Sequence, residues 1–375
     1  MTLKPDNNVE RKVLMRSLYQ TAMLGLCLVL YGTALYALPL DRPNQKRELY
    51  AHSWGQEVTD LAKSCESLNG AECAMLGRLI TMPHAYWIGA GVTVSKDIHE
   101  DLHNLIRDAQ REGRVPTIVL HALPNQGCEG DIRHGKRFVA ENYLKWVDQV
   151  SNAIRYYQSM PINIIIEPGG LAEVVTDREQ VCGKRTKTEV LEERIGLIHY
   201  VSWCFALLDK DKHRINPHLR LFVDIGHPSH ISGPREKMAI ADALENIIKG
   251  AVIDGVSVNV GGHDSFDESV TWAKEVIGLV RSSANTKLTI AVDIGRSGAR
   301  VEGQCNVRGA ALDVQPPTLA HADPRVELAM IIKHPGERDG DGPSCNGAAS
   351  VGNFDREMFM EYLRNSTLRH TFIGH

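Results

Sequence analysis

The sequence contains few aromatic residues and no long run of basic residues. Aromatic side chains make up 6% of the 375 residues, with five tryptophans, and the formal net charge is −4. Proteins that bind nucleic acid usually carry a clustered basic surface, so this class of partner is disfavoured. No glycine-rich phosphate loop follows the first apolar run, which argues against a dinucleotide-binding fold. With 43% hydrophobic residues, the chain can still bury a large core.

One segment near the N-terminus has no charged side chain. Residues 17–40, SLYQTAMLGLCLVLYGTALYALPL, are long enough to cross a bilayer as a helix. Four basic residues precede this segment: Lys4, Arg11, Lys12 and Arg16. Basic flanks favour the cytoplasmic side, so we predict a cytoplasmic tail (1–16), a transmembrane signal anchor (17–40) and a type II protein with its body lumenal or extracellular. A cleaved signal peptide, giving a secreted protein, and a buried helix of a soluble protein are the alternatives.

The cysteines suit a secretory compartment. Cys27 lies in the apolar segment, and Cys204 lies in an apolar helical pattern where a buried thiol is the ordinary outcome. The other six are Cys65, Cys73, Cys128, Cys182, Cys305 and Cys345. An even number in a secreted chain suggests disulfides, although spacing alone does not pair them. Asn365 begins a glycosylation sequon, Asn-Ser-Thr.

Short apolar, β-branched runs closed by Gly or Pro recur along the rest of the chain. They cover 79–88, 117–124, 162–168, 219–226, 253–262, 287–295 and 327–336. Such runs are typical of strands buried on both faces of a parallel sheet. Helical patterns lie between most of them, which leaves a doubly wound sheet or an α/β barrel. The repeated VDIG and the polar residues gathered at strand ends favour the barrel, with a stem at 41–74 and the barrel at 75–375.

Seven motifs occur in order: LHALPNQGC, IIIEPGGLAEVV, LFVDIGHPSHI, VSVNVGG, VDIGRSG, QCNVRG and IIKHPGERDG. Together they resemble glycoside hydrolase family 6, the cellobiohydrolases and endoglucanases that cut β-1,4-glucans with inversion. The resemblance implies a distorted barrel of about seven parallel strands. It also implies two disulfides, Cys128 with Cys182 and Cys305 with Cys345. It provides no counterpart for Cys65 and Cys73, for which a small local disulfide is one possibility.

Two positions that carry catalytic aspartates in the family are glycines in this chain. Inverting hydrolysis needs a carboxylic acid that protonates the leaving oxygen. The family's acid follows the Glu-Pro pair, where this chain has Gly169, and the family's supporting aspartate corresponds to Gly127. Glycine supplies neither a proton nor a charge, so the resemblance implies impaired catalysis. The carboxylates that could replace the acid are Glu129, Asp131 and Glu167.

Several aromatic positions of the family are also changed. The family's tyrosine beneath the reacting sugar corresponds to His121, and two stacking positions correspond to His230 and Gln304. The aspartate of the first strand corresponds to Gly89. Because aromatic rings stack on the apolar faces of sugars, these changes predict a lower affinity for glucose units.

Other positions keep the family's residues. Trp87 matches a sugar-stacking tryptophan, and Asp339 matches the aspartate proposed as base or as a sugar-binding group. The remaining matches that line the family's site are Asp224, His227, Lys333 and Glu337. Structural roles are the alternatives: core packing for Trp87, loop hydrogen bonds for Asp224 and His227, and an ion pair between Lys333 and Glu337. For Asp293 and Arg296, a structural role is favoured.

These observations predict a family 6-like, β-1,4-glucan-binding protein with impaired catalysis, held at a membrane. A cellulose synthase is one candidate partner, since some cellulose synthases carry family 6-like domains. The first alternative is an active membrane-anchored cellulase with a relocated acid, and the second is a structural or adhesion module. We expect no metal and no cofactor.

Overall fold

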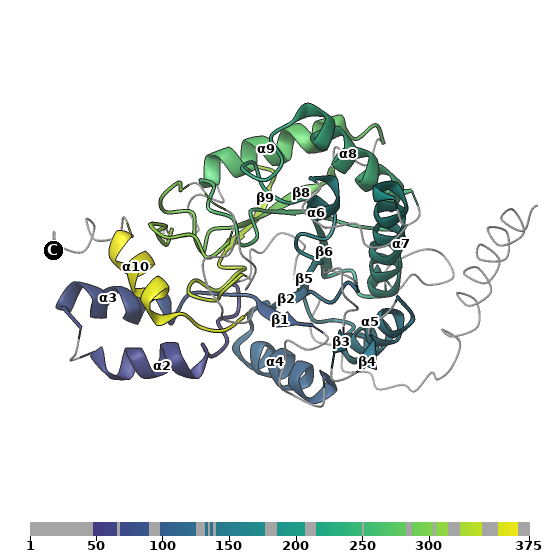
Figure 1. Cartoon of the computed structure of the whole chain (residues 1–375). Helices are drawn as coiled ribbons and strands as arrows, with labels where there is room; N and C mark the ends of the chain where they lie inside the picture. Colours follow the sequence, from purple (N-terminus) through teal and green to yellow (C-terminus); the bar gives the residue numbers. More distant parts are fainter. Residues whose placement is uncertain are drawn as a thin grey trace, which may run out of the picture. The chain divides into compact units, whose positions relative to one another are not determined.

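Seven parallel strands form the central sheet, in the order β1-β2-β5-β6-β7-β8-β9 (Figure 1). The strands are β1 (Tyr86–Ile88), β2 (Thr117–Leu120), β5 (Ile162–Ile166), β6 (Leu219–Asp224), β7 (Gly255–Val258), β8 (Thr289–Asp293) and β9 (Val326–Met330). Neighbours in the sheet are neighbours along the chain, so every crossover steps in the same direction. A doubly wound sheet would reverse its strand order, so the predicted α/β fold of seven parallel strands is confirmed, with the sheet curled into a half-barrel.

The computed structural model describes residues 48–366, with gaps at 66–67, 90–97, 125–131, 134–135, 138–139, 177–185, 207–214, 250, 283–286, 302, 304, 314–322 and 340–351. Each predicted strand run overlaps one observed strand, and the strands are shorter than the runs; β9 begins at Val326, one residue before its run. The apolar character continues past the last paired residue because the loops at the strand ends are buried as well. In this part of the chain, no helix has both the length and the apolar character needed to span a bilayer.

Helices cover the outer face of the sheet. They are α4 (Ile98–Glu112), α5 (Ala140–Arg155), α7 (Lys187–Ala206), α8 (Pro234–Ile248) and α9 (Phe266–Leu279), with the short α6 (Ala172–Val175) between β5 and α7. A separate antiparallel pair, β3 (Ile132–Arg133) and β4 (Lys136–Arg137), lies between β2 and α5. Because helices lie on the outer face and the sheet curls around the inner one, both faces of each central strand are buried, as the continuous apolar runs predicted.

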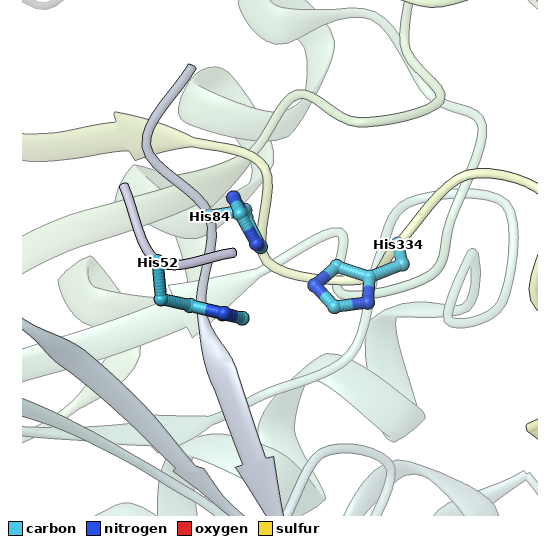
Figure 2. A group of neighbouring side chains, drawn as sticks. All are labelled: His52, His84 and His334. Carbon is cyan, nitrogen blue, oxygen red and sulfur yellow. The ribbon is translucent and has the colours of Figure 1, made fainter. Parts of the chain in front are cut away.

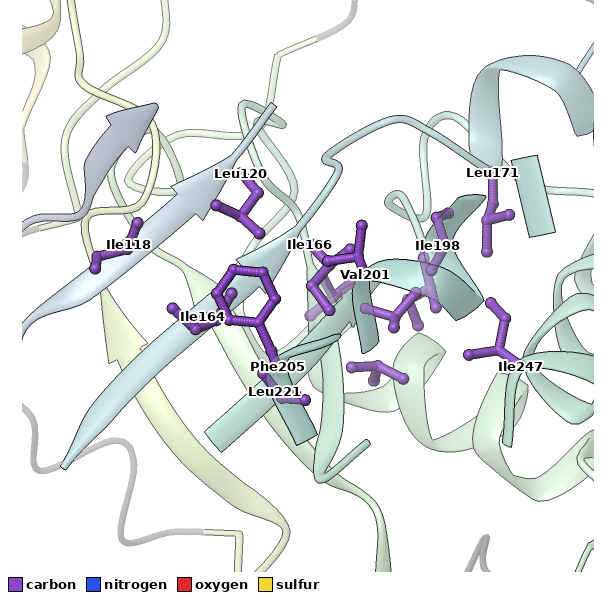
Figure 3. Packing of buried hydrophobic residues seen from close by; sticks show 14 of the residues in the cluster. Ile118, Leu120, Ile164, Ile166, Leu171, Ile198, Val201, Phe205, Leu221 and Ile247 are labelled. Atoms are coloured by element: carbon purple, nitrogen blue, oxygen red, sulfur yellow. The ribbon is translucent and has the colours of Figure 1, made fainter. Parts of the chain in front are cut away.

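The packing of β5 against α7 illustrates the outer core (Figure 3). Ile164 and Ile166 point outward from β5 and are fully buried, together with Ile198 and Phe205 of α7. Ile165, between them in sequence, points to the other face and joins the inner cluster. Burying each such side chain stabilises the fold by about 1.5–3 kcal/mol. The consecutive isoleucines of β5 therefore pack into the cores on both faces of the sheet.

The inner face of the sheet is an enclosed core. It is formed by Ala85, Val119, Ile165, Phe222, Ala291, Leu328, Met330 and Ile332. The two ends of the sheet approach each other where the Ala85 N–H donates to the Ile331 carbonyl oxygen, at 2.9 Å, and His84 forms a bridge with Ile331. This contact brings the segment before β1 beside the segment after β9.

Three further helices form a second cluster: α2 (Gln56–Lys63), α3 (Gly70–Leu79) and α10 (Arg356–Asn365). Val58 of α2 and Leu76 of α3 are buried with Phe359 of α10. The residues of α2, expected in the stem, therefore pack within this helical cluster. A disulfide between Cys65 and Cys73 links the two N-terminal helices, which resolves a pairing that spacing left open.

Candidate active site

Buried carboxylates lie at the carboxyl ends of three strands. Asp293, at the end of β8, is 1% exposed and accepts hydrogen bonds from four backbone N–H groups, at 2.9–3.0 Å. The donors belong to Gly261, Gly295, Ile332 and Lys333. A carboxylate with its acceptor sites filled in this way fastens loops together. The structural role favoured for Asp293 is therefore confirmed.

Asp224 has a similar environment at the end of β6. Its Oδ1 accepts hydrogen bonds from the N–H groups of Gly169 and Gly226, each at 3.0 Å, and its Oδ2 accepts one from the Ser257 hydroxyl at 2.9 Å. The side chain is buried, and burial raises its pKa to about 7 against the opposing effect of these donors. Asp224 thus connects β6 to the turn after β5 and lies directly beside Gly169.

Glu167 turns away from the strand-end site. Its backbone has a φ of 51°, an uncommon conformation for a residue with a side chain. The carboxylate accepts hydrogen bonds from the N–H groups of Ala122 and Leu123 and from the Tyr143 hydroxyl, at 2.8–3.1 Å. Burial raises its pKa to about 7. Because Tyr143 belongs to the outer core, Glu167 points elsewhere, as its position in the strand predicted.

Gly169 is half-buried and has a φ of +76°. A Cβ atom added at Gly169 would lie 2.9 Å from Oε1 of Glu173, on α6. The carboxyl group of Glu173 therefore lies where a side chain at position 169 would begin. Its Oε2 is 3.9 Å from Nη1 of the buried Arg194. Sequence reasoning missed Glu173, although its place four residues after Gly169, one helical turn away, was a usable signal.

Arg296 and Asp339 form an ion pair. Nη1 of Arg296 lies 2.8 Å from both carboxylate oxygens of Asp339, and Nη2 donates to the Glu337 carbonyl oxygen at 2.6 Å. Arg296 is fully buried, and the Asn306 N–H also donates to Asp339, at 3.2 Å. Burial, the largest single effect, would raise the pKa of Asp339, but the charges of Arg296 and Lys333 and the hydrogen bonds from Arg296 and Asn306 together lower it. This carboxylate is held ionised.

Lys333 and Glu337 form the ion pair considered from the sequence, with Nζ and Oε2 3.2 Å apart. Oε1 of Glu337 lies 2.8 Å from Nδ1 of His334. Burial would raise the pKa of Glu337, but the His334 hydrogen bond and the Lys333 charge together lower it to about 2. Glu337 is therefore a carboxylate anion between two hydrogen-bond donors, Lys333 and His334.

Trp87 is half-buried rather than a full core residue. Its indole N–H donates to the Ile332 carbonyl oxygen at 2.7 Å, which fixes the orientation of the ring. Nζ of Lys333 lies 5.0 Å from the ring centroid, and the His121 ring lies 5.4 Å away. The structure therefore brings together three predicted binding residues: Trp87, His121 and Lys333.

His227 and His230 form a second group at the end of β6, with ring centroids 5.1 Å apart. Nδ1 of His227 is 2.9 Å from Oδ2 of the buried Asp264, and Nε2 of His230 is 3.1 Å from the Thr176 hydroxyl. Both rings are half-buried, so each has atoms that reach solvent. Protein contacts hold both rings in place.

Several predicted positions lie outside the described residues. They are the segment 17–40, Gly127, Cys128, Glu129, Asp131, Cys182, Gln304 and Cys345. Cys305 is disulfide-bonded, as predicted, while its pairing with Cys345 stays a prediction. Cys204 is buried, as predicted, and its Sγ lies 3.8 Å from Oδ1 of Asp148. Asn365 is exposed at the end of α10, and its side-chain amide donates to the Ala310 carbonyl oxygen at 3.2 Å.

Comparison with known families gives a match over most of the chain. The sequence profile of the family described as glycosyl hydrolases family 6 matches residues 44–366. Endoglucanase A of Cellulomonas fimi is 24% identical over 309 residues, which are 81% of this chain and 59% of that protein. Exoglucanase 3 of Agaricus bisporus is 24% identical over 320 residues, 78% of this chain and 67% of that protein. The chain thus spans between about half and two thirds of the length of the curated relatives it matches.

Solved structures share the fold. The endoglucanase Cel6 of Mycobacterium tuberculosis superposes with a TM-score of 0.64 at 24% identity, covering 85% of this chain and 97% of that one. The catalytic core domain of the cellobiohydrolase Cel6A of Chaetomium thermophilum superposes with a TM-score of 0.68 at 20% identity, covering 86% and 97%. At these identities, the likeness establishes the fold.

Proposed function

Because this chain belongs to the glycosyl hydrolases of family 6, we propose that it binds a β-1,4-glucan at the strand ends of its barrel and hydrolyses it slowly or not at all. The observation that carries the loss of hydrolysis is Gly169, which occupies the position of the family's proton donor by resemblance. Glycine has no ionisable side chain, and general acid catalysis is worth about 10²–10⁴ in rate. Without a replacement donor, the leaving oxygen would depart unprotonated.

The proposed glucan contacts are the residues gathered beside Trp87. A tryptophan ring can stack on the apolar face of a glucose unit, while Lys333 and Glu337 can hydrogen-bond its hydroxyl groups. Half-burial leaves part of the Trp87 ring accessible, and the Ile332 hydrogen bond holds it in one orientation. Cel6A of Humicola insolens, a solved structure of the same fold, is described in complex with glucose and cellotetraose. This precedent supports a cello-oligosaccharide as the first ligand to test.

The other buried carboxylates at the strand ends are poorly placed to replace the acid. Glu167 is bound by Tyr143 and two backbone N–H groups, and Asp224 by Ser257 and two backbone N–H groups. Asp339 is ionised by its pairing with Arg296 and so cannot donate a proton. It is better suited to orient water or a sugar hydroxyl.

One described carboxylate favours the alternative, an active hydrolase with a relocated acid. Oε1 of Glu173 lies 2.9 Å from the position that a Cβ atom on Gly169 would occupy. Glu173 is about one third exposed and could reach solvent or a bound sugar from α6. This second function requires that Glu173 remains protonated when substrate is bound.

Two measurements on the purified full-length protein separate these functions. The first is binding of cello-oligosaccharides by calorimetry, and the second is release of reducing sugar from amorphous cellulose. We expect binding with little or no release. If the wild type releases reducing sugar, and this release disappears in Glu173→Gln but persists in the exposed control Glu141→Gln, the protein is an active hydrolase and our proposal is wrong. Absence of both binding and release would favour a structural or adhesion module.

We also propose that residues 17–40 anchor the protein as a type II membrane protein with its barrel lumenal or extracellular. The support is the charge-free sequence of this segment and the basic residues before it. A glucan-binding barrel on that side of a membrane would meet newly made polymer, which makes a cellulose synthase the first partner to test. Alkaline extraction of membranes and protease protection would check the anchor and its orientation. Release of the protein into the soluble fraction by alkaline extraction would contradict the anchor, and a barrel accessible to protease from the cytoplasmic side would contradict the orientation.

A further inference from the structure

Three histidines from separate segments meet near the closure of the sheet (Figure 2). His52 precedes α2, His84 precedes β1 and His334 follows β9. Their ring centroids are 3.8 Å apart for His52 and His84, 4.9 Å for His84 and His334, and 6.0 Å for His52 and His334. One ring nitrogen from each lies within 4.8 Å of the others. The contact between Ala85 and Ile331 brings these segments together.

Each ring has an oxygen acceptor beside its Nδ1 atom. Nδ1 of His52 lies 2.9 Å from the Ser53 carbonyl oxygen, and Nδ1 of His84 lies 3.1 Å from the Met82 carbonyl oxygen. Nδ1 of His334 lies 2.8 Å from Oε1 of Glu337. In a neutral imidazole, a donor at Nδ1 leaves the lone pair on Nε2. Metal-binding histidines usually have this arrangement, with the other ring N–H held by a carbonyl or a carboxylate.

Two of these rings have a buried Nε2 atom with no hydrogen-bond partner among the residues that the structure describes. They are His84 and His334. Nε2 of His52 has only a contact of 3.4 Å with the Ala85 carbonyl oxygen. A neutral His52 that donates from Nδ1 cannot also donate from Nε2. Burying unpartnered polar atoms is costly, so a purely structural role leaves this arrangement unexplained.

A carboxylate and an indole ring lie against the cluster. Oε1 of Glu337 lies 2.8 Å from Nδ1 of His334. Trp54 is buried against the other side of the cluster, with its ring centroid 4.3 Å from that of His84. Trp54 restricts where the rings can move.

We propose that His52, His84 and His334 bind one divalent transition-metal ion of the zinc class through their Nε2 atoms. Imidazole ligands suit zinc, copper, nickel and iron, and three histidines with an open fourth position are typical of zinc sites. Nitrogen ligands 2.0–2.1 Å from a tetrahedral ion are about 3.4 Å apart, so the ring nitrogens, which lie within 4.8 Å of one another, must approach by up to about 1.4 Å. A cavity of about 160 Å³ that includes Trp54, His334 and Glu337 in its wall provides an approach and room for a water ligand.

The same geometry connects the metal site to the proposed glucan contacts. Glu337 lies between His334 and Lys333, and Lys333 lies over Trp87. A metal ion on His334 would strengthen the hydrogen bond to Glu337 and fix the position of that carboxylate. Glu337 is therefore a positioning residue for the metal site. Metal binding itself does not depend on the proposed glucan function, so each can fail without the other.

The test is zinc binding by the full-length protein after removal of metal with a chelator. A competing chromophoric chelator measures affinity, and the absorption spectrum of the cobalt-substituted protein reports ligand number and geometry. We expect one equivalent of zinc per chain and a tetrahedral cobalt spectrum. His52→Gln and His334→Gln should each weaken binding by about 100-fold or more, and Glu337→Gln by about 10–100-fold, as outer ligands do. His218→Gln, at an exposed histidine away from the cluster, should bind as the wild type does.

Two results would overturn the proposal. One is the absence of saturable zinc binding by the folded wild-type protein. The other is unchanged affinity and an unchanged cobalt spectrum in both His52→Gln and His334→Gln. Circular dichroism in the presence of the chelator confirms that each protein is folded. His52 and His334 are both half-buried and lie outside the strands, so their variants should keep the fold.

Discussion

The carboxylate of Asp224 accepts a hydrogen bond from the backbone N–H of Gly169, 3.0 Å away. This bond fastens the turn after β5 to the end of β6. Position 169, which was expected to hold a proton donor, is thus held by the hydrogen bond to Asp224 although glycine has no side chain. A carboxyl group introduced at position 169 would enter an ordered turn with another carboxylate close by.

Replacing Gly169 with aspartate should therefore restore some hydrolysis. We expect release of reducing sugar from amorphous cellulose to rise in Gly169→Asp, and further when Gly127→Asp is added, up to the 10²–10⁴-fold attributed to general acid catalysis. Since Gly169 has a φ of +76°, the substitution should also cost about 1–2 kcal/mol of stability. Gly169→Asn is the control, because it has the same size and strain but no acid. Equal release by both variants would contradict the prediction.

Removing the Trp87 ring should weaken glucan binding. Loss of one stacking face, at about 0.5–1.5 kcal/mol beyond its buried area, corresponds to a loss of about 2–13-fold in affinity for cello-oligosaccharides. Calorimetric titration of Trp87→Ala measures this loss. Trp87→Phe keeps a ring but loses the hydrogen bond to Ile332, so it should have an intermediate affinity. Unchanged affinity in Trp87→Ala would place the glucan elsewhere.

The pH dependence of stability should change in Asp224→Asn. Burial raises the folded-state pKa of Asp224 to about 7, above its ordinary value of 3.8. A raised pKa means that the folded state holds more protons than the unfolded state between these values. The stabilising contribution of Asp224 is therefore complete below about pH 4 and is lost as pH rises through about 7.

Urea unfolding of wild type and Asp224→Asn across pH 4–8 tests this sign. Relative to wild type, the variant should become more stable as pH rises, because asparagine does not ionise. A difference in unfolding free energy that is constant with pH, or that moves the other way, would show that the three hydrogen-bond donors dominate over burial.

The Cys65–Cys73 disulfide should stabilise the N-terminal helices. It closes a loop with a sequence separation of 8, for which the chain-entropy relation gives about 2.5 kcal/mol. Cys65→Ser with Cys73→Ser should lower the free energy of unfolding by about this amount, measured in urea. Cys204→Ser is the control for the loss of a cysteine, since Cys204 takes no part in this disulfide. A double variant as stable as the wild type would show that the packing of α2, α3 and α10 suffices.

Local sequence was enough to predict the strands. In β5, consecutive isoleucines are buried on both faces, and this local pattern needs no knowledge of distant residues. The direction of a strand-end side chain was harder to predict. Glu167 points outward because its left-handed backbone turns it toward Tyr143, and Asp293 is saturated by backbone donors from three loops. Both outcomes depend on which loops meet at the strand ends.

The sequence by itself determined the parallel strands, the order of the motifs and the identity of the residue at position 169. These follow from runs of neighbouring residues, whose burial pattern and chemistry are local. Only the tertiary structure decided that Glu173 lies against Gly169 and that Cys65 pairs with Cys73. It alone brought His52, His84 and His334 together, since no spacing motif relates them. The physical reason for the histidine cluster is the curl of the sheet, which brings the segment before β1 into contact with the segment after β9.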